Sequence, residues 1–403
     1  MVRKARRVLT LLGPAFVAAV AYVDPGNFAA NFSAGAQYGY TLLWVLVFAN
    51  IMASLVQFLS AKVGLVTGKS LPEVIAENLG KKNRIAYWLQ AEAVAISTDI
   101  AEVMGGAIAL NILFGLPLLL GATITGIVSL ILLFIYTHRG QKIFERVVVG
   151  MLFIIPIGFF VGLAIKPPDA GGIVAGLVPH IRDGDMLLLA AAMLGATVMP
   201  HVVYLHSSLA RDRHGKKWDA ELHKLLRATK IDVGLAMLLA GSVNISMLLL
   251  AASALPGLEG TDSLQGIYQA LSSEISSLVG VLFGVGLLVS GFASTAVGAH
   301  AGAVIMEGMI NKQVPLYVRR VVTIIPAIII VALGFDPTYA LIISQVVLSF
   351  GIPFALVPLL LATSSKKIMG NYHNHPALSA GLGAITALIV VINAALIWLT
   401  IAR

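Results

Sequence analysis

Two short runs interrupt the long apolar segments of this chain and limit what it can fold into. Asp24-Pro25-Gly26-Asn27 breaks the first apolar segment, and Met199-Pro200-His201 breaks the sixth. A carboxylate, a carboxamide and helix-breaking prolines are costly inside hydrocarbon, so such runs within a membrane span indicate a site rather than a scaffold. Prolines also occur as simple kinks in packed transmembrane helices, and the sequence alone leaves that alternative open.

The composition excludes a soluble protein. Of 403 residues, 58% are apolar and 11% are charged, and the mean hydropathy is +0.93. Windows of about 20 apolar residues are long enough to cross the hydrocarbon core as helices. The sequence therefore predicts an all-α membrane protein with eleven transmembrane helices, near residues 8–30, 40–61, 85–112, 117–137, 147–165, 186–209, 231–254, 277–305, 320–335, 338–362 and 378–400.

The basic residues predict how the chain is oriented. Of the 27 Lys and Arg residues, all but Lys166, Arg182 and Arg403 fall on one side of this layout. The positive-inside rule places that side in the cytoplasm, with the N-terminus cytoplasmic and the C-terminus external. The net charge of +8 then reflects topology and contact with anionic lipid, and no nucleic-acid partner is expected.

The N-terminus has a second interpretation. A basic start, an apolar stretch and Ala19-Val20-Ala21 resemble a secretory signal with its cleavage site. Cleavage there would remove part of the first span, so we favour a retained helix.

The order of the spans suggests an internal repeat within a single transport domain, 1–403. Spans one to five (about 8–165) and six to ten (about 186–362) each begin with a proline-broken helix, and one further helix follows at about 378–400. Copying an odd number of spans inverts the copy in the membrane, as in many secondary transporters whose site lies where two broken helices meet.

The two prolines each free a backbone oxygen. Proline has no amide hydrogen to donate to the carbonyl four residues earlier. Pro25 therefore leaves the carbonyl oxygen of Ala21 without its helical partner, and Pro200 does the same for Ala196. Both carbonyls lie at the negative end of a half-helix, where a cation is favoured.

Side chains beside these carbonyls favour a transition metal. Asp24 and Asn27 supply hard oxygens, Met199 supplies a thioether, and the chain has no cysteine. Mg²⁺ and Ca²⁺ gain little from sulfur, whereas Mn²⁺, Fe²⁺, Co²⁺ and Cd²⁺ accept it better. A methionine in an apolar helix is usually core filler, and only its place directly before the break proline argues for a ligand.

The third span carries three carboxylates. Helical geometry places Asp99 about 20° from Glu92 and Glu102 about 60° from Asp99, so all three share one face. A stripe of carboxylates inside a membrane indicates a proton relay, and the alternative is a polar cluster that locks helix packing.

The histidines in the predicted spans say less about function than the carboxylates do. His201 and His206 are about 140° apart on a helix and cannot form the one-sided pair of a zinc protease. His201 could accept protons or make a structural hydrogen bond, and His300 is expected to pack among glycines and alanines.

The two breaks carry a family resemblance. With the eleven-span layout, they resemble the Nramp family of proton-coupled divalent metal transporters, and the bacterial manganese branch in particular; the motifs are Asp24-Pro25-Gly26-Asn27 and Gly195-Ala196-Thr197-Val198-Met199-Pro200-His201. The resemblance implies the LeuT-like 5+5 inverted-repeat fold with discontinuous helices 1 and 6. It also implies proton-driven import of Mn²⁺ and Fe²⁺ across the bacterial plasma membrane, with no cofactor, enzymatic activity or obligatory protein partner.

The resemblance also implies roles for individual residues. Asp24, Asn27, Met199 and the carbonyls of Ala21 and Ala196 would bind the ion, and Gln345 in span ten would join them in some conformations. Asp24 would also accept the first proton. Arg319 and Arg320, which could otherwise be plain positive-inside anchors, become partners of the Asp99 and Glu102 pathway, and Arg320 is the stronger candidate.

Three other classes of function remain open from the residues alone. A cation-coupled amino acid or amine symporter of the same fold would use Asp24 to meet a substrate amine. A channel would use Asp24 as a selectivity carboxylate. An intramembrane enzyme is the weakest alternative, because no nucleophile and base occur at usable spacing.

Overall fold

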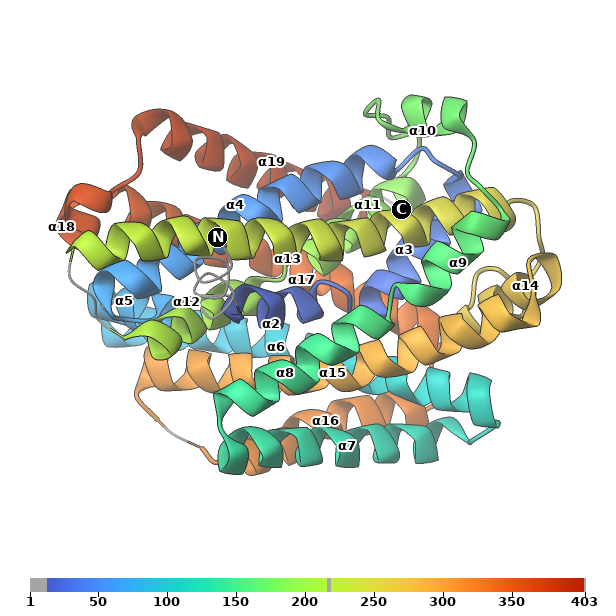
Figure 1. The fold of residues 1–403 in the computed structure, drawn as a ribbon, viewed down its shortest axis with the longest axis horizontal. Coiled ribbons are helices and arrows are strands. Elements are labelled where there is room, and N and C mark those ends of the chain that lie inside the picture. Colours follow the sequence, from blue (N-terminus) through green and yellow to red (C-terminus); the bar gives the residue numbers. More distant parts are fainter. Residues whose placement is uncertain (1–12, 216–218, 313, 402–403) are drawn as a thin grey trace, which may run out of the picture.

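The protein is a bundle of helices whose long members run roughly parallel to the longest axis of the molecule (Figure 1). A computed structural model describes residues 13–215, 219–312 and 314–401. The helices are α2 (Pro14–Ala21), α3 (Pro25–Tyr38), α4 (Leu43–Thr67), α5 (Leu71–Asn78), α6 (Lys81–Phe114), α7 (Leu118–Arg139), α8 (Gln141–Ile154), α9 (Ile157–Ile165), α10 (Ala170–Gly176), α11 (Gly184–Thr197), α12 (Pro200–His214), α13 (Asp219–Ala254), α14 (Leu264–Glu274), α15 (Ser277–Ile310), α16 (Leu316–Ala332), α17 (Pro337–Ser364), α18 (Lys366–Met369), the 3₁₀ turn η1 (Gly370–Tyr372) and α19 (Pro376–Ile401).

Every predicted span coincides with helix, although not every span is long. Within the described part of the chain, nine helical segments are long and apolar enough to cross a membrane. The other two predicted spans correspond to the pair α2 and α3 and to the 17-residue α16. The all-helical membrane fold is confirmed, and the count of eleven spans remains a prediction. Residues 8–12 of the first predicted span lie outside the described residues, as do the four basic residues before it, Lys216, Lys217 and Arg403.

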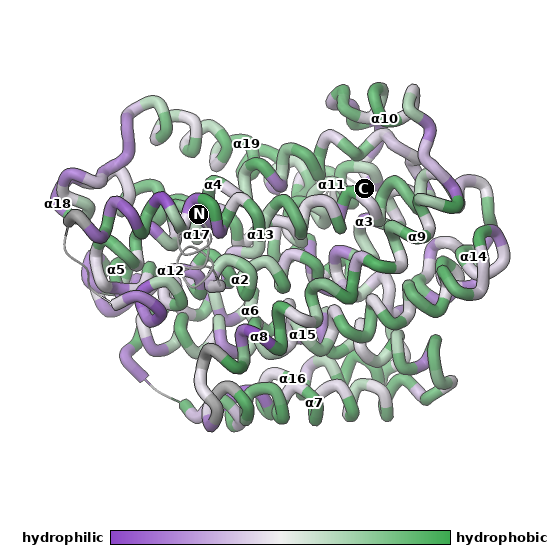
Figure 2. The backbone as a smooth tube through the Cα atoms, in the orientation of Figure 1, coloured by the Kyte–Doolittle hydropathy of each residue, from purple (hydrophilic) through white to green (hydrophobic). Residues whose placement is uncertain are grey.

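Polar residues lie at the ends of the bundle. Figure 2 shows hydrophilic stretches around α5, α12 and α18 at one end and around α14 at the other, with apolar helices between them. A membrane protein shows this distribution because the hydrocarbon core accepts apolar surface and the two interfaces accept polar surface.

Both predicted breaks are present. The first span divides into α2 and α3, and Asp24 caps α3 by accepting a hydrogen bond from the backbone nitrogen of Asn27. The sixth span divides into α11 and α12, with Met199 at the capping position of α12 and Pro200 as its first residue. Proline is tolerated in the first turn because the amide hydrogen that it lacks would have no helical partner there.

The packing of the helices repeats between the two halves. After each break, the second half-helix lies against the second span of the other half, α3 on α13 and α12 on α4. Before each break, the first half-helix lies against the fifth span of its own half, α2 on α8 and α11 on α17. The third spans α6 and α15 pack along each other (Figure 1). These matched pairings support two related halves, whose residue limits remain a prediction.

The fifth span differs from the sequence prediction. The window 147–165 was expected to be one helix, but α8 ends at Ile154 and α9 begins at Ile157, with Pro156 between them. The missing amide hydrogen of this proline contributes to the interruption.

Candidate metal site and the charged path beside it

Asn27 joins the two breaks. Its side-chain nitrogen donates hydrogen bonds to Asp24 Oδ1 at 2.8 Å and to the carbonyl oxygen of Ala196 at 3.1 Å. Asp24 and Asn27 are completely buried, as is Ala196. The structure therefore brings together three of the predicted ligands from segments about 170 residues apart in the chain.

Gln345 of α17 lies close to residues of both breaks. Its side-chain nitrogen is 3.4 Å from Asp24 Oδ2. A Cβ atom on Gly26 would be 1.8 Å from that nitrogen, and a Cβ on Gly195 would be 1.9 Å from the backbone oxygen of Gln345. The backbone of α17 leaves no room for a side chain at position 195, whereas a side chain at position 26 would displace the Gln345 amide.

Two amide oxygens at this site lack a partner. Asn27 Oδ1 and Gln345 Oε1 are buried and make no hydrogen bond. The hydroxyl oxygen of Thr197, beside the second break, is also buried without a hydrogen-bond partner. An unpaired buried acceptor is costly unless something else satisfies it, and a cation is one such partner.

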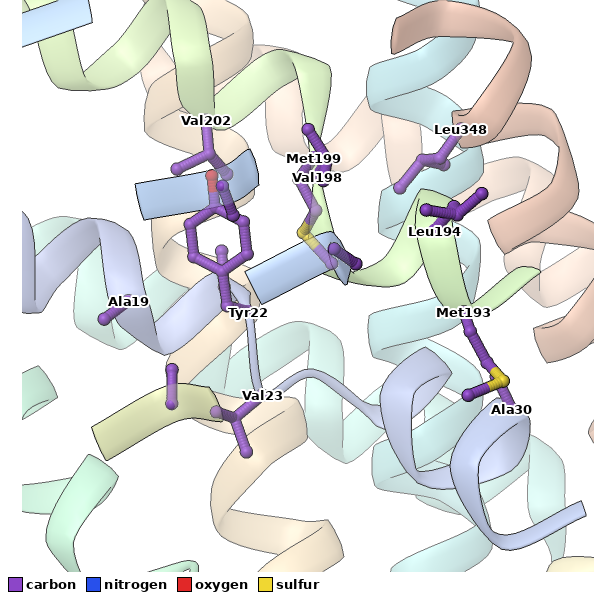
Figure 3. Close-up of a cluster of buried hydrophobic side chains, with 14 of the residues drawn as sticks. Ala19, Tyr22, Val23, Ala30, Met193, Leu194, Val198, Met199, Val202 and Leu348 are labelled. Carbon is purple, nitrogen blue, oxygen red and sulfur yellow. The ribbon is translucent and has the colours of Figure 1, made fainter. Parts of the chain in front are cut away.

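Met199 is the remaining side chain of the predicted ligand set. It is fully buried, and it lies in one cluster with Tyr22 and Val23 of the first break (Figure 3). In that view its side chain extends toward the segment that joins α2 and α3. The carbonyls of Tyr22 and Val23 accept hydrogen bonds from Asn244 at 2.7 Å and from Ser290 at 2.5 Å, whereas Pro25 can offer none to Ala21.

This donor set suits one divalent cation of intermediate softness. One carboxylate, two amides, two backbone carbonyls and a thioether combine hard oxygen with one soft atom. Among the described residues, no three His, Asp or Glu side chains come together in a way that could hold a metal. A metal at this position would therefore depend on amide and carbonyl oxygens and on the Met199 sulfur.

A second buried polar group lies between α6 and α16. Arg320 is fully buried and forms an ion pair with Asp99. Its Nε donates to Ser129 Oγ at 2.6 Å, and its Nη1 lies 3.9 Å from Glu102 Oε2. Neither carboxylate oxygen of Glu102 has a hydrogen-bond partner.

The neighbouring arginine forms a separate pair. Arg319 makes two contacts with the Glu92 carboxylate, Nη2 to Oε1 at 2.6 Å and Nη1 to Oε2 at 2.9 Å. Both arginines thus face the carboxylates of α6, and neither is a plain anchor at the membrane surface. A two-point contact of this kind is the strong geometry for arginine and carboxylate.

The histidines are held by polar neighbours. His201 Nδ1 lies 3.3 Å from Thr98 Oγ1, and His206 Nδ1 lies 2.6 Å from Gln57 Oε1. Gln57 also donates to the hydroxyl of Tyr22, so His206 is linked to the first break. His300 is buried and borders a cavity of about 740 Å³ between α7, α15 and α16.

Sequence reasoning missed the polar contacts at one end of α2. Asp232 of α13 accepts from the backbone nitrogens of Gly13 and Ala15, both at 3.2 Å, and so caps α2. Glu145 of α8 pairs with Arg213 of α12 at 2.8 Å. A survey of carboxylates at the ends of every apolar window, rather than of the third alone, would have found both acids.

The fold, in which two broken helices meet at a buried polar group, is typical of a secondary transporter. The sequence matches the family description "Natural resistance-associated macrophage protein-like" over residues 15–399. It is 55% identical over 392 residues to the divalent metal cation transporter MntH of Mycobacterium tuberculosis H37Rv, covering 97% of this chain and 92% of that protein. It is 49% identical over 399 residues to MntH of Bacillus subtilis, with 98% and 93% covered.

Comparison with solved structures gives the same family. The manganese transporter of Eremococcus coleocola, in complex with an aromatic bis-isothiourea substituted compound, is 31% identical and superposes with a TM-score of 0.85, covering 97% of this chain and 86% of that one. Mhp1 (16% identical, TM-score 0.62) and MhsT (12%, 0.64) share the fold alone. The chain belongs to the Nramp family. It is accordingly a multi-pass membrane transporter rather than an enzyme, as the sequence predicted.

Proposed function

We propose that the protein imports divalent transition metal ions, Mn²⁺ and Fe²⁺ foremost and also Co²⁺ and Cd²⁺, across the bacterial plasma membrane by alternating access, coupled to inward proton flow. One observation carries the proposal above all. Asp24, Asn27 and the Ala196 carbonyl converge between the two breaks with unpaired amide oxygens beside them. The names of the relatives support a metal substrate.

Transport requires the site to open. Asp24, Asn27 and Met199 are wholly buried, so an ion bound there could neither enter nor leave without a change in the packing of the half-helices. The half-helices of the first span share α13 and α15 as neighbours but differ in the others, since α2 packs on α8 and α12 whereas α3 packs on α11 and α17. Such a difference allows one end of the site to open while the other stays closed.

Proton coupling uses Asp24 together with the carboxylates of α6, which take no part in the metal site. We assign Asp24 as metal ligand and first proton acceptor, with Asp99, Glu102 and Glu92 continuing the route and with Arg319, Arg320 and His201 as its polar partners. The pairs Arg320 with Asp99 and Arg319 with Glu92 support this assignment, because both place buried charges along α6. Buried charges in a membrane span usually mark such a route.

The test uses purified protein in liposomes. Mn²⁺ uptake and acidification of the lumen, reported by an enclosed pH-sensitive dye, are recorded together under an inside-negative potential. We expect saturable Mn²⁺ uptake accompanied by proton entry, and inhibition by Cd²⁺ but not by a mixture of amino acids. Uptake that amino acids block, or flux that never saturates, contradicts the proposal in favour of an amine symporter or a channel.

The proposed orientation, N-terminus cytoplasmic and C-terminus external, has its own test. The chain has no cysteine, so single cysteines can be introduced without a background. In intact cells, a membrane-impermeant maleimide should label Lys166→Cys, and it should label Lys367→Cys only after permeabilisation. The reverse pattern contradicts the orientation.

A further inference from the structure

We infer that Gly302 of α15 is a positioning residue for proton coupling, because its missing side chain creates the room in which Arg319 reaches Glu92. The inference rests on the proton-coupled function proposed above. It adds a requirement on α15, a helix that supplies neither carboxylate nor arginine to the two ion pairs.

The space at Gly302 is filled by the guanidinium of Arg319. A Cβ atom there would lie 2.1 Å from Nη2, 2.5 Å from Cζ and 2.7 Å from Nε of that side chain. Real Cβ atoms do not approach other atoms so closely. Gly302 lies inside a continuous helix and has no positive φ, so its backbone would accept alanine. An alanine at this position would therefore leave the backbone in place but force the Arg319 guanidinium to move.

One turn earlier, Gly298 makes the same kind of room for Glu102. A Cβ on Gly298 would lie 2.8 Å from Oε1 and 3.1 Å from Oε2 of that carboxylate. Residues four apart share a helix face, so both glycines form one groove on α15. Glu102 is fully buried and both of its oxygens lack hydrogen-bond partners, which makes the groove a lining for charged groups rather than an ordinary helix contact.

The groove lies within a group of titratable and charged side chains. α6 and α16 supply the two ion pairs and Glu102, whose carboxylate makes no hydrogen bond, and the nearby cavity adds further groups from α15 and α7. The ion pairs and the cavity lining bring together Glu92, Asp99, Glu102, Arg319, Arg320, His300, Glu307 and His138.

A methyl group at position 302 would separate Arg319 from Glu92. Arg319 is only 5% exposed, so a displaced guanidinium has little water to receive it and Glu92 loses its partner. The metal site contains no part of this pair, so metal binding should survive.

The experiment compares Gly302→Ala with wild type in the same liposomes. We expect metal-driven proton entry to fall by about tenfold or more, as when a buried charge loses its partner, with the Mn²⁺ dissociation constant changed by less than about twofold. Gly234→Ala on α13 is the matched control, because a Cβ there meets nothing within 4 Å. It should behave as wild type.

A double variant separates positioning from helix packing. If Gly302 acts through Arg319, Gly302→Ala should add nothing to Arg319→Ala, because the alanine at 319 leaves the space empty. A further loss in the double variant, or unchanged proton entry in Gly302→Ala, overturns the inference. Wild-type protein that takes up Mn²⁺ without any proton entry instead contradicts the proposed function, so the two failures are distinguishable.

Discussion

The side-chain nitrogen of Asn27 lies 3.1 Å from the carbonyl oxygen of Ala196, and it donates to that oxygen and to Asp24 at once. The NH₂ group of Asn27 thus occupies the place between two oxygens that a cation would bind. Its own carbonyl oxygen has no partner. Metal binding should therefore replace the NH₂ group with the ion and turn the amide so that Oδ1 faces the site.

Asp24→Asn should abolish metal binding. The substitution keeps the shape of the side chain but removes the only carboxylate of the proposed ligand set, and it adds a second NH₂ group where an ion needs an acceptor. We expect Mn²⁺ affinity to fall at least about 100-fold, the upper range for disturbing a metal site. Titration calorimetry measures it, with the exposed Asp262→Asn as control. Robust uptake by Asp24→Asn would remove this residue from the mechanism.

Met199→Ala should change selectivity more than rate. Without the thioether, the remaining oxygens suit Ca²⁺ and Mg²⁺ as well as Mn²⁺. We expect Mn²⁺ uptake to persist while competition by Ca²⁺ or Mg²⁺ increases, measured as inhibition of radiolabelled Mn²⁺ uptake. Met193→Ala removes another buried methionine of the same cluster and should leave competition unchanged. If Met199→Ala and Met193→Ala discriminate equally well between Mn²⁺ and Ca²⁺ or Mg²⁺, the Met199 sulfur has no role in selectivity.

The sequence predicted the two functional breaks because proline, glycine and polar residues coincide there. Proline alone is not enough. Pro326, Pro353 and Pro358 lie inside continuous helices, whereas Pro156 interrupts the fifth span. Whether a span breaks depends on which neighbours satisfy the freed carbonyl, and the local sequence does not contain that information.

The long-range partners could not be derived from the sequence either. Helical geometry placed Glu92, Asp99 and Glu102 on one face, but the pairing of Arg319 with Glu92 and of Arg320 with Asp99 depends on how far α16 is shifted along α6. Residues more than 220 positions apart come into contact only through tertiary packing.

Arg320→Ala should destabilise the fold as well as stop coupling. The variant leaves Asp99 buried without its partner, which costs about 3–5 kcal/mol when one member of a buried pair is removed. We expect a lower thermal unfolding midpoint in detergent, measured by intrinsic fluorescence. The double variant Asp99→Asn/Arg320→Ala removes both charges and should recover most of the lost stability without recovering proton entry. A double variant as unstable as Arg320→Ala contradicts this account of the pair.

Asp183→Asn should leave the pH dependence of uptake unchanged. Asp183 lies just before α11 and accepts hydrogen bonds from the backbone nitrogen of Met186 at 2.8 Å, from Arg182 at 3.2 Å and from the Tyr38 hydroxyl at 3.1 Å. The bond from Met186 is the main cause that holds the pKa of Asp183 below its ordinary value of 3.8. A carboxyl with a lowered pKa stays ionised above that value and gains a proton only below it. The contact between the C-terminal end of α3 and the N-terminal end of α11 is therefore constant between about pH 5 and about pH 7, the range chosen for acid-stimulated uptake. Wild type and Asp183→Asn should gain the same fold of Mn²⁺ uptake on external acidification. A flattened profile in Asp183→Asn would assign the external proton sensor to this carboxylate instead of to the buried acids of the two sites.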